Sequence, residues 1–177
     1  MHKPLLPKRK NIRLSGYNYS LEGCYFVTIV VQKRLCLFGD VVDGLMNLNA
    51  AGNMVSMAMM ELEERFPGVK IPYSVVMPNH VHFIVYLPGD IRLNNVVSSF
   101  KGYTTHLYSE LLKEGARPYL GKLWQRNYYE HIIRSSRSYD FISHYIIVNP
   151  ERWNKDTLNT HHDPDPDNIM KTVLDIP

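Results

Sequence analysis

Cysteine is scarce in this 177-residue chain, and long apolar runs are absent from it. The two cysteines, Cys24 and Cys36, lack the spacing of a metal ligand set or a redox pair, and a chain of this size does not need a disulfide. No apolar run approaches the ~20 residues that cross a bilayer, and Leu5-Leu6 is too short for a signal-peptide core. We therefore expect one domain with reduced thiols and no membrane partner, located in the cytoplasm and nucleoid-associated if the source is bacterial.

A large excess of charge of one sign is also missing, because the formal net charge is only +3. The basic residues nevertheless gather in two zones, residues 1–13 and residues 92–137. Each lysine or arginine that neutralises a phosphate releases counterions, so these zones favour a polyanion as partner. Charge alone fits a solvated basic face equally well.

The order of the expected secondary-structure elements indicates the fold class. Runs rich in β-branched and aromatic residues predict strands over 25–31, 69–77, 80–87 and 128–133. Apolar residues at steps of three and four predict helices over 47–66 and 92–114, and a third helix over 138–149 begins with Ser138 as N-cap and Asp140 in its first turn. This order is that of a ferredoxin-like α+β fold, a split β-α-β sandwich whose antiparallel sheet carries two helices on one face. The third helix would lie on the other face.

Three segments are expected along the chain. Residues 1–20 are polar and basic and predict an N-terminal arm, whereas residues 21–153 contain all the expected strands and helices and predict the folded domain. Residues 154–177 are acidic and contain alternating aspartate and proline, a composition typical of a flexible tail.

The sharpest motif is a pair of histidines on the expected strand over 80–87. Side chains alternate along a strand, so His80 and His82 point to one face while Val81 points to the other. Two imidazoles in this arrangement can hold a divalent metal and leave coordination positions open for a substrate. A third ligand is needed, and the apolar residues at 83–85 disfavour the zinc hydrolases that continue such a pair with an aspartate and another histidine.

Tyr145 and Asn149 lie four residues apart in the expected third helix and therefore share one of its faces. An amide oxygen is a suitable ligand for a hard cation, and a helix crossing the free face of the sheet could bring Asn149 to the histidine pair. The metal would polarise a phosphodiester, and the phenol beside it could attack phosphorus. The alternative is that Tyr145 is one more aromatic residue facing the core.

At these residues the sequence resembles the single-tyrosine HUH transposases and, within them, the REP-associated tyrosine transposases, relatives of insertion-sequence enzymes that move as single-stranded DNA. The resemblance spans about residues 14–153 and rests on segments in the family's order: YFVTI at 25–29, LFG at 37–39, MPNHVH at 77–82, WQRNYYEH at 124–131 and YIIVNP at 145–150. It implies that His80 and His82 bind the metal and that Tyr145 is the nucleophile. Asn149 matches the third ligand, where insertion-sequence relatives carry glutamine.

The resemblance also implies an activity, that of an endonuclease and strand-transferase. Tyr145 would attack a phosphate of single-stranded DNA, near a hairpin-forming repeat, to give a 5′-phosphotyrosine link and a free 3′-hydroxyl that can attack later. The cofactor would be magnesium or manganese, and imidazole ligands fit manganese rather better. Assembly stays open, because some relatives are homodimers that exchange the tyrosine helix and others act as monomers.

Two rival functions remain at this point. One is a non-catalytic module of the same fold that binds single-stranded nucleic acid. The other is a metal-dependent phosphodiesterase that uses water, which would need the histidines but not Tyr145.

The candidate DNA contacts lie in both basic zones. Residues 124–134 mix aromatic rings with polar and basic side chains, a composition suited to stacking unpaired bases and holding phosphates. A packing role for Trp124 explains its presence equally well. The arm would hold a hairpin stem or a flanking strand without specifying sequence. The candidates are Lys8, Arg9, Lys10, Arg13, Lys101, Trp124, Arg126, Asn127 and Arg134.

Overall fold

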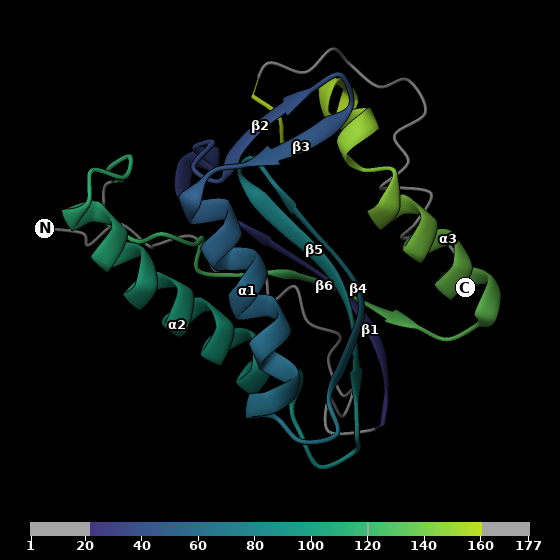
Figure 1. Ribbon diagram of the computed structural model, residues 1–177. Helices are drawn as coiled ribbons and strands as arrows, with labels where there is room; N and C mark the ends of the chain where they lie inside the picture. The colour runs from purple at the N-terminus through teal and green to yellow at the C-terminus, as the bar shows by residue number, and fades with distance from the viewer. Residues whose placement is uncertain (1–21, 120, 161–177) are drawn as a thin grey trace, which may run out of the picture.

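The computed structural model describes residues 22–119 and 121–160. Within them, one antiparallel sheet has helices on both faces (Figure 1). The strand order across the sheet is β4-β5-β1-β6, which is the order of the predicted ferredoxin-like fold. The sheet strands are β1 (Gly23–Val30), β4 (Lys70–Met77), β5 (His80–Leu87) and β6 (Tyr129–Ile133).

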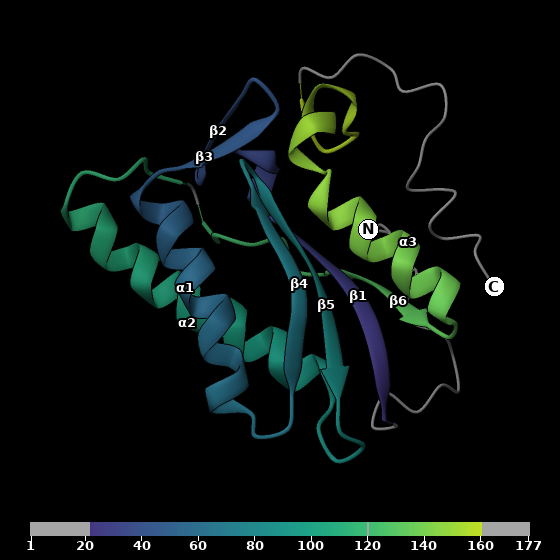
Figure 2. The same ribbon diagram turned by 45° about the vertical axis from the view of Figure 1, so that its right-hand side comes forward.

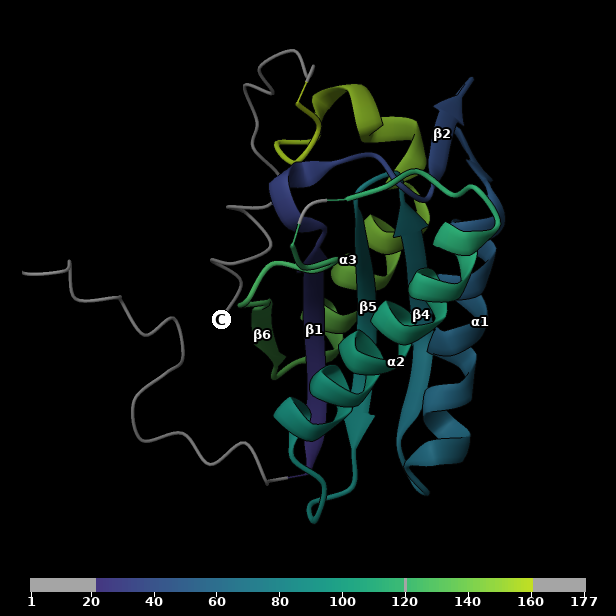
Figure 3. The ribbon, with the colours of Figure 1, turned by 90° about the vertical axis from the view of Figure 1, so that its left-hand side faces the viewer.

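Two helices cover one face of this sheet and a third covers the other. Figures 2 and 3 show α1 (Ala50–Arg65) and α2 (Leu93–Lys113) side by side on one face, with α3 (Ser136–Ile147) on the opposite face. The fold class predicted from the sequence is therefore confirmed. Nowhere in residues 22–119 and 121–160 does a helix combine the length and the apolar character that a membrane crossing requires.

The main core lies between the sheet and the two-helix layer. Val55, Met59 and Leu62 of α1 are buried at the predicted helical spacing, and Val96 and Phe100 of α2 are buried in the same cluster. Each fully buried apolar side chain of this size contributes roughly 1.5–3 kcal/mol. The cluster between the sheet and these two helices has more buried members than the one on the other face, so it supplies most of the apolar burial.

The strand register decides which side chains face α3. In the pairing of β1 with β5, Thr28 lies opposite His82, and Val30 lies opposite His80. Because the pleat alternates, Val81 joins the main core, whereas the two histidines lie on the α3 face. A second, smaller apolar cluster fills that face, and its buried members are Phe26, Ile84, Ile142, Tyr145 and Ile146.

The first predicted helix begins three residues later than expected, because residues 39–48 form a hairpin. Its strands are β2 (Gly39–Val42) and β3 (Leu45–Leu48), and α1 starts after Asn49, whose side chain accepts a hydrogen bond from the Gly52 amide at 2.9 Å. Asp43 and Gly44 both have positive φ, as a two-residue hairpin turn requires. Residues 47 and 48 therefore belong to β3 and residue 49 to the helix cap, not to the helix itself.

The predicted start of the third helix is also wrong. Ser135, not Ser138, is the N-cap, and its hydroxyl accepts a hydrogen bond from the Ser138 amide at 3.2 Å. Asp140 therefore lies beyond the first turn. The helix starts this early because only Arg134 separates the end of β6 from its cap.

Residues 150–160, partly assigned to the tail, pack against the fold. A short 3-10 helix, η2 (Pro150–Lys155), buries Trp153, and Asn159 is buried after it. This segment therefore contributes buried side chains to the fold. The remaining tail and the arm with Lys8, Arg9, Lys10 and Arg13 lie outside the described residues.

Candidate metal and nucleophile site

The two histidines project from β5 into a buried space beneath α3 and η2. Both are 0% exposed, and their ring centroids lie 4.5 Å apart. Trp153 of η2 covers His80, with ring centroids 6.0 Å apart, and Phe26 of β1 stacks on His82 at 5.3 Å. The predicted pairing of His80 and His82 on one face of a strand is thus confirmed.

His80 presents an unprotonated Nε2 to this space. Its Nδ1 lies 2.8 Å from the Asn79 side-chain oxygen, and an amide oxygen only accepts, so Nδ1 carries the proton. Burial lowers the His80 pKa well below its usual range, with further lowering from the charges of His82 and Arg34, so the ring is neutral. Nε2 is buried and has no hydrogen-bond partner among the residues that the structure describes.

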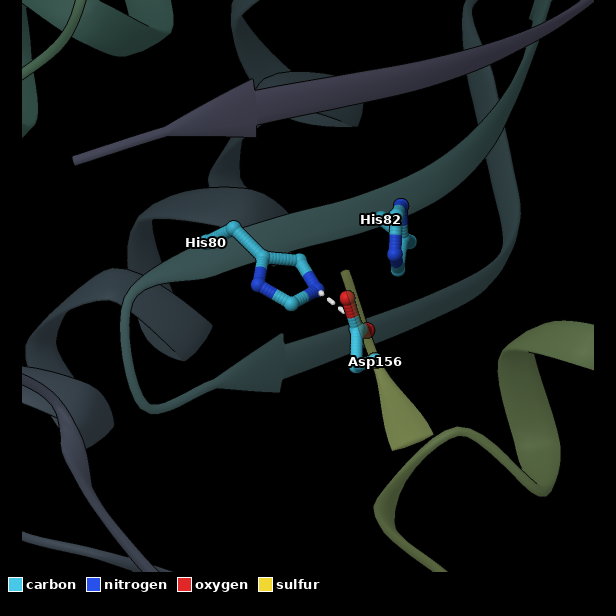
Figure 4. Close-up of side chains that lie close together, drawn as sticks. All are labelled: His80, His82 and Asp156. Atoms are coloured by element: carbon cyan, nitrogen blue, oxygen red, sulfur yellow. Dashed lines mark ion pairs between the residues drawn. The ribbon is translucent and has the colours of Figure 1, made fainter. Parts of the chain in front are cut away.

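Asp156 faces that nitrogen, as Figure 4 shows. Its Oδ2 lies 3.7 Å from His80 Nε2, and its side chain is 7% exposed. A nitrogen lone pair and a carboxylate oxygen that face each other are both electron donors, and a divalent cation could accept both of them. One ligand atom from each of His80, His82 and Asp156 lies within 4.8 Å of the others, a spacing that suits one metal ion.

His82 is held between a hydroxyl and a phenol. Its Nδ1 lies 2.7 Å from Thr28 Oγ1, and its Nε2 lies 3.4 Å from the Tyr145 hydroxyl. A Tyr145 hydroxyl that donates to Nε2 requires the His82 proton on Nδ1, which then donates to Thr28. Burial lowers the His82 pKa to about 3, so this ring is neutral as well.

Tyr145 reaches the histidines from α3. It is 7% exposed, and its ring packs edge-on against His82 and Phe26, with centroid distances of 5.3 Å and 6.0 Å. Burial raises its pKa far above the usual value, the charge of Asp156 adds to this, and a side-chain hydrogen bond with Asn149 acts in the opposite direction. The phenol is therefore protonated in this arrangement.

Asn149 lies close to Tyr145, as predicted, just past the end of α3. Its backbone stays helical, with φ −56° and ψ −42°, and its side chain is 2% exposed. Among the described residues none donates to its Oδ1, so this oxygen is available to a cation. Its role as a ligand stays a prediction, and Asp156 is a ligand candidate that the sequence analysis missed.

The candidate DNA contacts divide into exposed and internal residues. Arg126, Asn127 and Arg134 are exposed. Trp124 is 3% exposed, and its Nε1 donates to Thr104 Oγ1 at 2.8 Å, so it packs in the core and offers no face to a base. Lys101 Nζ donates to two backbone carbonyls, those of residues 125 and 126, at 2.7 Å and 3.0 Å, which holds that loop in place.

A further positive charge that the sequence analysis missed lies beside the site. Arg34 ends the short helix η1 (Gln32–Arg34), where both Lys33 and Arg34 have positive φ. Its guanidinium donates to the Thr157 carbonyl at 2.9 Å, close enough to His80 to lower the pKa of that ring. No sequence pattern marks Arg34 as part of the site, because the fold alone brings it close to His80 and Thr157.

Comparisons with known proteins agree with this geometry. Residues 52–149, more than half of the chain, match a family model described as "Transposase IS200 like". An uncharacterised protein of Haemophilus influenzae is 37% identical over 166 residues, which cover 85% of this chain and 92% of that protein. The REP-associated tyrosine transposase of Escherichia coli is 26% identical over 133 residues, 75% of this chain and 68% of that protein.

A solved structure gives the same result for the fold. The structure of a REP-associated tyrosine transposase bound to a REP hairpin aligns with a TM-score of 0.58 and 26% identity, over 77% of this chain and 73% of that one. The match of the family model over most of the folded domain, from α1 to Asn149, includes the histidine pair and Tyr145. The chain therefore belongs to the IS200-like transposase family.

Proposed function

We propose that this protein is a metal-dependent endonuclease and strand-transferase that acts on single-stranded or hairpin DNA, with Tyr145 as nucleophile. The observation that carries the proposal is the convergence of His80, His82 and Asp156 within 4.8 Å, beside a phenol that lies 3.4 Å from His82 Nε2. Metal ligands next to a buried tyrosine fit phosphoryl transfer to a side-chain oxygen better than they fit a passive binding module.

The donor set fits a divalent metal such as manganese or magnesium. Two neutral imidazoles and a carboxylate suit manganese better than magnesium, which prefers oxygen ligands alone. The oxygens of Asp156 and Asn149 lie on segments that follow α3, so either or both could complete the set with His80 and His82. When bound, the metal would supply Lewis-acid polarisation of the scissile phosphate.

The protein residues would perform the following chemistry. The Tyr145 oxygen forms a bond to phosphorus, the bond from phosphorus to the 3′-oxygen breaks, and the proton lost by the phenol is balanced by the one gained at the new 3′-hydroxyl. His82 and Phe26 orient the ring by edge-on packing. The reverse attack by a 3′-hydroxyl on the phosphotyrosine rejoins a strand and needs no external energy source.

The nature of the DNA partner follows from the relatives and from exposed charge. A solved relative holds a REP hairpin, and Arg126, Asn127 and Arg134 are exposed here on the segment that leads into and out of β6. We infer that these residues contact a hairpin or its single-stranded flank. Assembly as a monomer or as a homodimer remains open, and the mass of the protein in solution would decide between them.

The test is cleavage of single-stranded hairpin oligonucleotides taken from the flanks of the gene. The 3′ end is labelled, because the fragment downstream of the cut would stay on the protein through its 5′-phosphate. We expect a manganese-dependent adduct on a denaturing gel with wild-type protein and none with Tyr145→Phe or EDTA. Tyr139→Phe is the matched control, because Tyr139 lies on the same helix and packs against Tyr73.

The other outcomes separate the rival functions. Cleavage without an adduct that survives Tyr145→Phe would identify water as the nucleophile. If oligonucleotides from both DNA strands of the gene's flanks are bound but none is cleaved, the result would favour the non-catalytic binding module.

A further inference from the structure

Asn79 uses every hydrogen-bonding group of its buried side chain. It is 0% exposed and forms the turn between β4 and β5. Its Nδ2 donates to the carbonyls of Arg34 at 3.1 Å and Leu158 at 2.9 Å, and its Oδ1 faces His80 Nδ1 at 2.8 Å. Two carbonyl acceptors fix the amide orientation, since a flipped amide would place its oxygen against both of them.

The first consequence concerns His80. With its orientation fixed, the Asn79 oxygen selects the His80 tautomer that carries its proton on Nδ1 and leaves Nε2 free. An outer hydrogen bond of this kind also sets the rotation of the ring and makes Nε2 a better ligand.

The second consequence concerns Asp156. The Leu158 carbonyl accepts from Asn79, while the Leu158 amide donates to Asp156 Oδ1 at 2.7 Å. Asp156 Oδ2 in turn faces His80 Nε2 at 3.7 Å. The contacts therefore close a ring, from His80 through Asn79, Leu158 and Asp156 back to His80.

We propose that Asn79 is a positioning residue that sets His80 and Asp156 as a pair of metal ligands, one through its acceptor and the other through its donors. This inference rests on the proposed metal site. The third hydrogen bond of the side-chain amide, to the Arg34 carbonyl, locks the same side chain to η1 and leaves it no other orientation. Thr28 makes the corresponding contact for His82, since its hydroxyl lies 2.7 Å from Nδ1 of that ring.

The test is calorimetric titration of the full chain with Mn²⁺ alone, without DNA. Asn79→Ala removes the acceptor and both donors, and we expect Mn²⁺ affinity to fall about 10- to 100-fold. Asn79→Leu keeps the size of the side chain but also removes the acceptor and both donors, so it should lose about as much affinity as Asn79→Ala without leaving a cavity. Asn49→Ala is the stability control, because Asn49 caps α1 and also bonds the Leu37 carbonyl, away from the histidines.

Each outcome decides one question. Mn²⁺ affinity that falls in both Asn79→Ala and Asn79→Leu and is unchanged in Asn49→Ala supports the inference. Wild-type affinity in either folded Asn79 variant overturns it, as does an equal loss in Asn49→Ala, which would tie affinity to stability alone. A wild-type protein that binds no Mn²⁺ overturns the proposed metal function itself and this inference with it.

Discussion

Acid should destabilise the metal-free protein, because two buried neutral histidines must become charged. Burial lowers the His82 pKa to about 3 and lowers the His80 pKa well below its usual range. In the unfolded chain a histidine titrates near 6.5. Below about pH 6.5 the unfolded chain therefore binds more protons than the folded one, so the free energy of unfolding falls with falling pH until about pH 3.

The size of the effect follows from the pKa of His82. At pH 5 the solution is about 1.5 units below the unfolded pKa and still above the folded one, and each unit corresponds to about 1.36 kcal/mol. His82 alone should therefore cost about 2 kcal/mol of unfolding free energy at pH 5, and His80 adds a loss of the same sign. This is a large share of the 5–15 kcal/mol typical of a domain.

Urea unfolding in EDTA, followed by circular dichroism at pH 7.5 and pH 5.0, measures this loss. Other groups also titrate in this interval, so the informative quantity is the difference between variants. His82→Asn should lose about 2 kcal/mol less than wild type between the two pH values, whatever its absolute stability. His106→Asn is the control, because His106 is exposed on α2. An identical pH dependence in wild type and His82→Asn would refute the reasoning.

Three further predictions concern single residues. Asp156→Asn should weaken Mn²⁺ binding at least tenfold by calorimetry, since it removes the charge that faces His80 Nε2, and wild-type affinity would exclude Asp156 as a ligand. Trp124→Ala should cost about 3–5 kcal/mol of unfolding free energy because it empties a core position, whereas Arg126→Ala should leave stability within about 0.5 kcal/mol and reduce the salt dependence of DNA binding. Unchanged stability and weaker DNA binding in Trp124→Ala would instead place Trp124 at the DNA interface. Gly39→Ala should destabilise the hairpin in urea unfolding, because φ is +130° and a Cβ there would lie 2.0 Å from a β3 carbonyl oxygen; unchanged stability would contradict that geometry.

The sequence was sufficient to predict the parts of the site that depend on the periodicity of a single strand or helix. Alternation along one strand placed His80 and His82 on the same face, and helical spacing placed Tyr145 and Asn149 together. The order of the elements predicted two helices on one face of the sheet and the third helix on the other, and α3 does cover that second face.

The rest of the site depends on contacts between remote segments. Asp156 lies 76 positions after His80 in a stretch whose composition resembles a tail, and no local pattern marks it as a ligand. Asn79 reads as an ordinary turn residue until the fold brings the Leu158 carbonyl to its amide. Trp124 was predicted to contact DNA but is buried in the core. An aromatic residue in a basic segment looks the same in the sequence whether it stacks on bases or packs in a core.

The most direct test of the central claim is mass spectrometry of the covalent protein–DNA adduct after digestion with trypsin and nuclease. Cleavage after Arg137 and Arg152 releases residues 138–152 as one peptide that contains both Tyr139 and Tyr145. We expect a nucleotide remnant attached through phosphate to Tyr145, with Tyr139 unmodified. A remnant on Tyr139, or on any residue outside this peptide, would contradict it.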